Sequence, residues 1–323
     1  MANDDRAIDA ADDWGLRPDD DMFHPPESSD PWWTETIWFS WMVPERNLLG
    51  YWYTVFRPNI GVVFGGVLVF DHTAVLPWEI PVFDWNWHQP MPAGGVDLRD
   101  LNVLNDMTLQ CVEHGRRFRF GYTAEHVAFD LTYEALMQPM LSRHTPPFNH
   151  GNHIDQPGRV TGSFMLHGES IPVDCIAMRD RSWGIRTPRR QPKLGYCHAT
   201  AGPDSSFLAI TIDRKGVDGL VGGYLMRDGQ WEALVSGERR VVRDAGGRPA
   251  EVTLQATDAA GRDLEAVGTT VSRQVFTAYP DMFCWNSLAR WHYDGVDAWG
   301  EDQDIWHPRK WRAHALSIGA LVH

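Results

Sequence analysis

Short runs of β-branched and aromatic residues recur along almost the whole chain. Three of them are TIWFSWMV (36–43), GYWYTVFR (50–57) and RRFRFGY (116–122), and Gly, Pro, Asn or Asp stands at one end of each. Runs of this length and composition are typical of antiparallel strands. Few stretches show the 3.6-residue period of a helix, so the sequence predicts a mainly β fold with few short helices.

The expected strands fall into two series, which indicates two β-barrels or sandwiches in tandem. A Pro- and His-rich stretch, 138–157, separates the two series and is typical of a linker. The expected divisions are an acidic N-terminal arm at 1–30, an N-terminal β-barrel domain at 31–145 and a C-terminal β-barrel domain at 146–323. Short helices are expected at 98–105 and 134–142, and a closing strand at 311–319.

The net charge of the chain indicates which classes of binding partner are unfavourable. The net charge is −14, which argues against nucleic acid because phosphate binding needs a basic surface. Much of the acidity lies in the first 30 residues, which hold ten Asp or Glu and two Arg. We interpret that segment as a disordered or loosely attached arm.

Several features favour a cytoplasmic protein. The opening MANDDRAIDAADDWG has neither the basic nor the apolar region of a signal peptide. No run of about 18 apolar residues is present, so we expect no membrane span. The four cysteines form no CxxC pair, and free thiols are typical of the cytoplasm. The oligomeric state stays open.

Tryptophan is unusually abundant, with 16 residues in one chain. A buried indole needs a partner for its N–H group, so this many rings favours wide apolar surfaces, such as the walls of a ligand cavity. The alternative is that the rings are large core fillers. The residues expected to bind an apolar ligand are Trp38, Trp41, Trp52, Tyr53, Trp85, Trp87, Trp183, Trp285 and Trp299.

The densest mixture of charged and aromatic residues is RDRSWGIR (179–186), directly after the strand-like SIPVDCIAM. The two-residue period of a strand puts Arg179, Arg181 and Trp183 on one face. Asp180 then lies on the other face. The run therefore predicts two chemically different faces at the end of one strand.

Together with RDRSWGIR, the stretches GRVTGSFMLHG, GYCHAT, SSFLAI and DGVDAWGED give the chain a family resemblance over about residues 155–311. The chain resembles the hydroxyneurosporene synthase (carotenoid 1,2-hydratase) and AttH-like superfamily, whose relatives include plant-type tocopherol cyclases and fungal kievitone hydratase-like enzymes. The resemblance implies two tandem lipocalin-like antiparallel β-barrels. It also implies a cofactor-independent hydratase, dehydratase, cyclase or isomerase that uses acid catalysis on a hydrophobic terpenoid-, steroid- or polyketide-like substrate.

The resemblance implies a proton donor in a dry cavity, where aromatic faces would stabilise the cation formed from a protonated alkene. Arg181 stands where the hydratases carry a histidine in a D-H-S-W-G-like motif. Arginine stays charged and is a poor general acid. Either the acid lies elsewhere, or Arg181 clamps a carboxylate or carbonyl oxygen of the ligand.

Asp180 is the adjacent candidate for the acid. It would have to stay protonated near neutral pH, which requires desolvation. Two flanking arginines favour the carboxylate instead. The alternative is therefore a structural anion paired with Arg179 or Arg186.

Two further sets of polar residues are candidates in the second series of strands. Tyr196 and His198 alternate along one expected strand, so they share a face and suit either a proton relay or a satisfied core pair. Asp302 is either a carboxylate at a barrel mouth or part of a solvated loop. The expected catalytic residues are Asp180, Arg181, Tyr196, His198 and Asp302.

We expect no metal and no other cofactor. His144, His150, His153 and Asp155 are of metal-ligating type, but their spacing fits no metal motif. P-loop, GxGxxG and G-x-S-x-G motifs are missing, which disfavours nucleotide-dependent enzymes and serine hydrolases.

The expected partner is a small hydrophobic substrate. A lipocalin-like carrier without turnover and a structural protein with inert barrels remain alternatives to an enzyme. Ionisable groups that converge inside an apolar cavity would favour the enzyme.

Overall fold

The computed structural model describes residues 14–93, 95–103, 106–145, 148, 151–187 and 193–321. The chain divides into two compact units. Unit 1 consists of Met1–Val43, Gly50–Val69 and Val82–Arg186. Unit 2 consists of Pro44–Leu49, Phe70–Pro81 and Thr187–His323.

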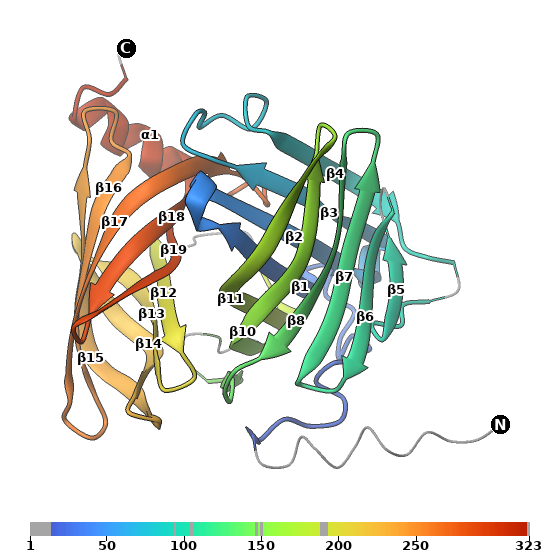
Figure 1. The fold of residues 1–323 in the computed structure, drawn as a ribbon, viewed down its shortest axis with the longest axis horizontal. Helices are drawn as coiled ribbons and strands as arrows, with labels where there is room; N and C mark the ends of the chain where they lie inside the picture. The colour runs from blue at the N-terminus through green and yellow to red at the C-terminus, as the bar shows by residue number, and fades with distance from the viewer. Residues whose placement is uncertain are drawn as a thin grey trace. The chain divides into compact units, whose positions relative to one another are not determined.

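An 11-stranded antiparallel sheet forms unit 1, and Figure 1 shows that it is strongly curled. The strand order is β4-β3-β2-β1-β11-β10-β8-β7-β6-β5, and β9 pairs with β10. The strands are β1 (Trp33–Val43), β2 (Leu48–Arg57), β3 (Val62–Phe70), β4 (Val82–Pro90), β5 (Asp100–Val103), β6 (Met107–Glu113), β7 (Arg117–Ala124), β8 (Val127–Ala135), β9 (Met140–Arg143), β10 (Gly151–Leu166) and β11 (Glu169–Ile185). Two 3-10 turns, η3 (Pro44–Arg46) and η4 (Pro58–Ile60), follow β1 and β2.

The core of unit 1 is aromatic. Phe39 stacks on Phe120 with ring centroids 4.8 Å apart, and Tyr133 packs edge-on against Phe39 at 5.6 Å. Every residue of β1 is buried, so this strand has buried neighbours on both faces of the sheet. That is why large apolar residues occur on both faces of this strand rather than in strict alternation with polar ones.

Unit 2 contains a closed barrel of the strands β12 to β19 and one helix. The elements are β12 (Leu194–Gly202), β13 (Ser205–Arg214), β14 (Val217–Arg227), β15 (Gln230–Arg243), β16 (Pro249–Asp258), β17 (Asp263–Phe276), β18 (Phe283–Tyr293), β19 (Val296–Trp306) and α1 (Pro308–Ser317). Phe207 packs edge-on against Trp291 and Tyr293 inside the barrel. A Cβ at Gly268 would come within 2.8 Å of the Trp291 ring, so this glycine makes room for the largest core side chain.

The prediction of a mainly β fold is confirmed, whereas several local predictions are wrong. Residues 98–105 and 134–142 contribute to β5, β8 and β9 instead of helices, because pairing with neighbouring strands outweighs local helix propensity. Residues 311–319 lie largely in α1 instead of a strand. Pro308 begins this helix, His307 caps it by accepting from the Arg309 N–H, and Trp311 stacks on Phe283 at 4.7 Å.

The unit boundary also differs from the expected domain boundary near residue 145. Residues 151–157 of the expected linker form the first half of β10, which pairs with both β9 and β11. Because β10 and β11 complete the first sheet, unit 1 continues to Arg186.

The acidic segment before β1 is docked on unit 1 where the structure describes it, so the expectation of a loosely attached arm is wrong for residues 14–30. Asp20 is buried and pairs with Arg143 at 2.7 Å. Asp21 is buried against Arg179 at 2.5 Å and His114 at 2.7 Å. Burial by itself raises the pKa of Asp21, but Arg179 and His114 outweigh it and hold the pKa well below its ordinary value of 3.8.

This pairing predicts a specific loss of stability in acid. Below pH 3.8, the ordinary value, the unfolded chain binds a proton that the folded Asp21 does not, so the free energy of unfolding falls as the pH falls. In Asp21→Asn, the free energy of unfolding should fall by about 1.4 kcal/mol less per pH unit than in the parent chain. Urea unfolding between pH 4 and pH 2.5 measures it. Asp130→Asn, in an exposed pair with Arg119, is the control, and an equal change of slope in both variants would contradict the prediction.

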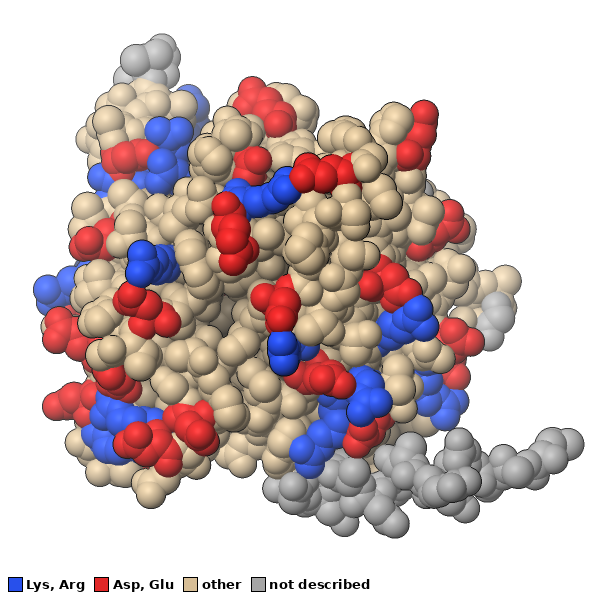
Figure 2. Space-filling view, viewed as in Figure 1, with Lys and Arg blue, Asp and Glu red and all other residues tan. Residues whose placement is uncertain are grey.

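The described surface carries both signs of charge. On the face shown in Figure 2, acidic and basic side chains are interspersed. Exposed pairs such as Arg159–Asp174, at 2.7 Å, contribute to this mixture. Among the described residues, no helix has the length and apolar character needed to cross a bilayer.

Candidate active site

Three strands bring a histidine, two aspartates and a tryptophan to one face of the unit 1 sheet. In the strand register, Asp180 of β11 lies opposite Asp155 of β10 on one side and opposite Trp38 of β1 on the other. His153 is two residues before Asp155 on β10, so it points to the same face. We call His153, Asp155 and Asp180 the acid cluster.

The imidazole of His153 lies between the two carboxylates. Its Nε2 is 3.0 Å from Oδ1 of Asp155 and 3.4 Å from Oδ2 of Asp180. The ring of Phe148 stacks on it at 3.9 Å. His153 and Asp155 are buried, while 25% of the Asp180 side chain is exposed. Asp180 is therefore the member of the acid cluster that is most open to a ligand.

The two carboxylates control the charge of the imidazole. Burial by itself lowers the pKa of His153, because it disfavours the imidazolium. Asp155 and Asp180 raise it more strongly, and the pKa lies above the ordinary value of 6.5. The raised pKa favours the imidazolium, so His153 can serve as a proton store beside an aspartate that is able to accept the proton.

The raised pKa can be measured directly. We expect the His153 ring to titrate above pH 6.5, the ordinary value, when it is followed by nitrogen NMR. Replacing Asp155 by Asn should lower the pKa of His153, because the imidazolium loses a charged partner while its burial stays. The exposed His126 beside Glu125 serves as an internal reference. A His153 pKa that does not move in Asp155→Asn would contradict this account of the electrostatics.

A row of aromatic rings continues from the acid cluster along the same sheet. Trp38 contacts Tyr51 at 4.0 Å and Tyr53 at 4.9 Å between ring centroids. Tyr53 lies 6.0 Å from Trp85, which lies 5.7 Å from Trp87. Trp38 and Tyr53 are buried, whereas Trp87 is 43% exposed. This aromatic row therefore leads from Asp180 to the surface, and it brings together four of the residues that we predicted to bind substrate.

The opposite face of β11 carries the arginines, as the strand period predicts. Arg179 pairs with Asp21, not with Asp180. Arg181 is buried and donates hydrogen bonds to Glu35 and to the main-chain oxygen of Met22. Arg181 is thus not positioned to hold an oxygen beside the acid cluster.

Three of the predicted tryptophans pack on that opposite face. Trp183 stacks on His24 with ring centroids 3.9 Å apart. Trp52 donates its indole N–H to the carbonyl oxygen of Gly121 at 3.1 Å, and Trp41 packs on Phe164 at 4.7 Å. Trp41 and Trp52 are fully buried. For these rings the structure favours the alternative of core fillers.

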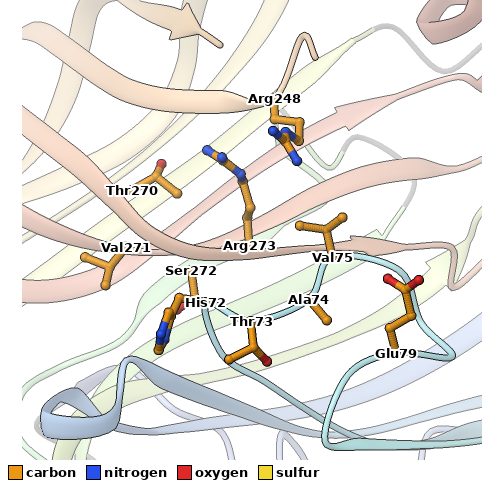
Figure 3. A pocket seen from close by; sticks show the side chains of 10 residues that line it. All are labelled: His72, Thr73, Ala74, Val75, Glu79, Arg248, Thr270, Val271, Ser272 and Arg273. Carbon is orange, nitrogen blue, oxygen red and sulfur yellow. The ribbon is translucent and has the colours of Figure 1, made fainter. Parts of the chain in front are cut away.

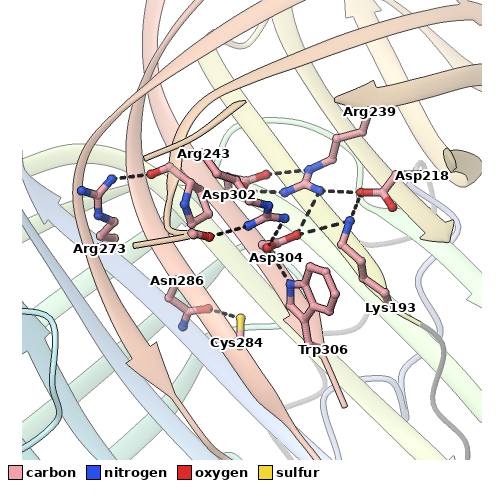
Figure 4. Close-up of polar contacts among 12 residues, drawn as sticks. Lys193, Asp218, Arg239, Arg243, Arg273, Cys284, Asn286, Asp302, Asp304 and Trp306 are labelled. Carbon is pink, nitrogen blue, oxygen red and sulfur yellow. Dashed lines mark hydrogen bonds and ion pairs between the residues drawn. The ribbon is translucent and has the colours of Figure 1, made fainter. Parts of the chain in front are cut away.

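In unit 2, Asp302 belongs to a cluster of charged side chains inside the barrel (Figure 4). Its two carboxylate oxygens accept from Nε and Nη2 of Arg239 at 2.9 and 2.7 Å. Burial raises the pKa of Asp302 although Arg239 opposes this. The members of this barrel ion cluster are Lys193, Asp218, Arg239, Arg243, Asp302 and Asp304. Asp302 therefore lies neither in a solvated loop nor in unit 1 with the acid cluster.

Tyr196 and His198 share a face of β12, with ring centroids 5.8 Å apart. Strand alternation puts them on the side opposite Cys197, which belongs to the barrel core. His198 is buried, with Nε2 3.5 Å from Oε1 of Glu301. The predicted pairing of a phenol and an imidazole is present, on the outward side of the barrel wall.

The two remaining predicted tryptophans are in unit 2 as well. Trp285 is buried and lies 5.7 Å from Trp311 of α1. Trp299 is half-buried on β19. It is three residues before Asp302, so it lies on the opposite face of the strand. Neither belongs to the aromatic row of unit 1.

Unit 2 also has a pocket of about 280 Å³, shown in Figure 3. Its lining is mostly polar and includes Arg248 and Arg273. Both arginines already bind Asp244, at 2.8 and 3.0 Å. None of the predicted site residues lines this pocket, and its lining lacks the aromatic wall expected for an apolar ligand.

Within the described residues, only the acid cluster brings together three side chains of metal-ligating type, with donor atoms within 4.8 Å of one another. The contact of 3.0 Å between His153 Nε2 and Asp155 Oδ1 has the ordinary length of a hydrogen bond between an imidazole and a carboxylate, a pairing that suits proton transfer. Of the other residues that the sequence suggested, His144 lies 3.5 Å from the Asn152 amide, and His150 is outside the described residues.

Sequence reasoning missed His153 as a candidate acid. His153 and Asp155 alternate in HID, the same pattern that singled out Tyr196 and His198. The prolines and glycines around HID are typical of a linker, although HID itself has the alternation of a strand. The alternation of His153 with Asp155 is the signal that identifies them as neighbours on one face.

One protein family covers most of the chain. The family described as "Domain of unknown function (DUF7064)" matches residues 17–303. Among curated proteins, none matches this sequence.

Solved structures with the same fold are distant in sequence. An AttH protein from Nitrosomonas europaea is 17% identical, with a TM-score of 0.57 over 90% of this chain and 96% of its own. Kievitone hydratase from Nectria haematococca is 13% identical, with a TM-score of 0.52 over 85% of this chain and 89% of its own. CghA is 12% identical, with a TM-score of 0.55 over 86% and 89%. The chain therefore shares the fold of these solved structures, which is the fold that the resemblance in sequence implied.

Proposed function

Because this chain belongs to the DUF7064 family and folds like an AttH protein and a hydratase, we propose that it is an enzyme of the hydratase or cyclase type. It acts by acid catalysis on a carbon–carbon double bond of a hydrophobic substrate, such as a terpenoid, steroid or polyketide, and needs no cofactor. The observation that carries the proposal is the acid cluster, in which His153, whose pKa is raised, lies beside a partly exposed Asp180 and Trp38.

The reaction begins with the proton held on His153. It passes from Nε2 to the Asp180 carboxylate, 3.4 Å away, and from Asp180 to one carbon of the double bond. The electron pair of the π bond forms the new C–H bond, and the other carbon becomes a cation. The faces of Trp38 and Tyr53 stabilise this cation through their quadrupoles.

The cation has two ways to react further. In hydration, a water molecule adds to the cation and loses a proton, which returns to the Asp180–His153 pair. In isomerisation or cyclisation, the cation loses a proton from a neighbouring carbon to Asp180. Both routes restore the starting protonation state, and the reverse of hydration is dehydration by the same groups.

Isotope incorporation tests the proposal without knowledge of the product. The purified chain is incubated, without added cofactor, with prenyl alcohols, sterols and prenylated phenols in heavy-oxygen water and, separately, in heavy water. We expect one substrate class to gain ¹⁸O or carbon-bound deuterium by mass spectrometry, and EDTA not to reduce the rate. Ligands that quench tryptophan fluorescence but never incorporate either isotope would favour a carrier. Activity that EDTA abolishes and zinc restores would overturn the proton-store role of His153.

A further inference from the structure

A second row of polar side chains crosses the unit 1 sheet beside the acid cluster. Ser182 of β11 lies opposite Thr36 of β1 on one side and opposite His153 of β10 on the other. Directly opposed residues on one face of a sheet have adjacent side chains. Ser182 is two residues after Asp180, so it points to the same face, roughly 7 Å further along the strand. Two hydroxyl groups therefore lie next to the acid cluster.

An arginine completes this polar row. Arg186 directly follows β11 and donates a hydrogen bond from Nη2 to Oγ of Ser182, and the same oxygen lies 2.8 Å from Oγ1 of Thr36. Gly184, which stands between the arginine and the serine, has no side chain to keep them apart. Burial and, less strongly, the positive charge of Arg186 lower the pKa of His153 against the two aspartates. We call Arg186, Ser182 and Thr36 the oxygen row.

Arg186 is the member of the oxygen row that a ligand can reach. It is half-buried, whereas Ser182 and Thr36 are buried. Its main-chain N–H donates to the carbonyl oxygen of Trp32 at 2.9 Å, which holds its backbone in place. A guanidinium carries five N–H donors, so the bond to Ser182 uses only one of them. The oxygen row therefore presents hydrogen-bond donors on the face where Asp180 is partly exposed.

The charges around the oxygen row favour a ligand oxygen without a formal charge. The carboxylates of Asp155 and Asp180 balance Arg186 and an imidazolium at His153. A ligand carboxylate would add a third negative charge close to the first two, which is unfavourable.

We propose that the oxygen row binds an uncharged carbonyl or hydroxyl oxygen of the substrate, a few bonds away from the double bond that Asp180 protonates. The oxygen accepts a hydrogen bond from the guanidinium of Arg186, and bonds from charged donors are the stronger ones. The proposal rests on the proposed function for the identity of the double bond, whereas the binding of the oxygen needs no turnover.

The position of the oxygen row narrows the substrate class. Pure hydrocarbons have no oxygen for Arg186 to bind, whereas terpenoid ketones, sterols and prenylated phenols do. Because the row lies on the same face as Asp180, an oxygen held there also determines which double bond of a polyene reaches the acid. The substrate is therefore an oxygenated alkene and not a hydrocarbon.

Three prenyl ligands test this specificity by binding alone. Farnesylacetone, farnesene and farnesoate share an isoprenoid chain and carry a ketone, no oxygen and a carboxylate. Titration of the parent chain near neutral pH, followed by tryptophan fluorescence, should show the ketone binding about tenfold more tightly than the other two. A ketone that does not bind more tightly than both of the others overturns the proposal.

The variant Arg186→Met removes the donors and keeps an unbranched side chain. We expect its affinity for farnesylacetone to fall about tenfold while its affinity for farnesene stays within about twofold. The pKa of His153, followed by nitrogen NMR, should rise because a positive charge beside the imidazolium is removed. Arg159→Met, in an exposed pair with Asp174 on the same sheet, is the matched control and should change none of these values. A ketone preference that survives in Arg186→Met, or a His153 pKa that does not rise, overturns the proposal.

Asp180→Asn separates this proposal from the proposed function. The variant should lose turnover and keep the preference for the ketone, because Asp180 protonates the double bond and does not hold the oxygen. A parent chain that prefers the ketone but never incorporates isotope would be a carrier with an oxygen row. A chain that incorporates isotope without any ketone preference would be an enzyme whose substrate is held elsewhere, which overturns the oxygen row alone.

Discussion

Asp180→Asn should lower the turnover of any substrate that incorporates isotope by about 100-fold or more, and should change Tm by no more than about 1 °C. The asparagine keeps the shape of the side chain but cannot accept the proton of His153, which is 3.4 Å away. Asp180 is partly exposed, so its neutralisation leaves no deeply buried charge without a partner. The measurement is a rate assay by mass spectrometry combined with a thermal melt.

Asp174→Asn is the matched control, because it makes the same chemical change on the same strand. Asp174 lies in an exposed pair with Arg159, and exposed pairs contribute little to stability. Its rate and its Tm should match those of the parent chain. A large loss of Tm in Asp180→Asn together with substantial residual turnover would instead assign Asp180 the role of a structural anion.

Arg239→Leu should destabilise unit 2 more than any other single replacement considered for the barrel. Arg239 has no exposed side-chain surface and pairs with Asp302, Asp218 and Asp304. Removing it leaves three carboxylates in the barrel with only Lys193 and Arg243 to compensate. Breaking a buried pair in this way typically costs about 3–5 kcal/mol, which corresponds to a fall in Tm of roughly 10 °C for a unit of this size.

The neighbouring Arg240 provides the control, because its side chain is 70% exposed and pairs only with Glu238 among the contacts described. Arg240→Leu should melt within about 1–2 °C of the parent chain. The double variant Arg239→Leu, Asp302→Leu should recover part of the lost stability, since it removes the uncompensated carboxylate as well. Equal melting temperatures for Arg239→Leu and Arg240→Leu would show that the barrel ion cluster contributes nothing to folding.

Local patterns in the sequence predicted the strands and their faces, because both depend on a period of two residues. Alternation alone predicts that Asp180 lies on the face of its strand opposite to Arg179 and Arg181. The structure places them on opposite faces of β11, as expected. It also paired Tyr196 with His198 on one face. The prediction of a mainly β fold is confirmed.

Long-range pairing could not be derived in the same way. Asp180 and Trp38 are neighbours only because β11 pairs with β1, and no local pattern specifies that register. His153 becomes a partner of Asp180 through the pairing of β10 with β11. The first half of β10 lies in the Pro- and His-rich stretch, whose composition is typical of a linker and not of a strand.

Composition gives a wrong prediction where charged residues have partners far away in the sequence. The acidic residues Asp20 and Asp21 resembled those of a disordered arm, but Arg143 and Arg179 bind them. A count of charges near the N-terminus cannot show that complementary arginines lie more than 100 residues further along the chain. Asp302 likewise has a distant partner, Arg239 of β15, which lies 63 residues earlier in the sequence.

During synthesis on the ribosome, β1 emerges long before the strand that covers it. Thr36 of β1 and Ser182 of β11, which share a hydrogen bond, are 146 residues apart. Until β11 is made, the nascent chain carries an unpaired edge whose residues are all destined for burial. Such an edge recruits other chains by strand addition, so fast translation at high expression should drive this protein into inclusion bodies, and slower synthesis or a holding chaperone should return it to the soluble fraction.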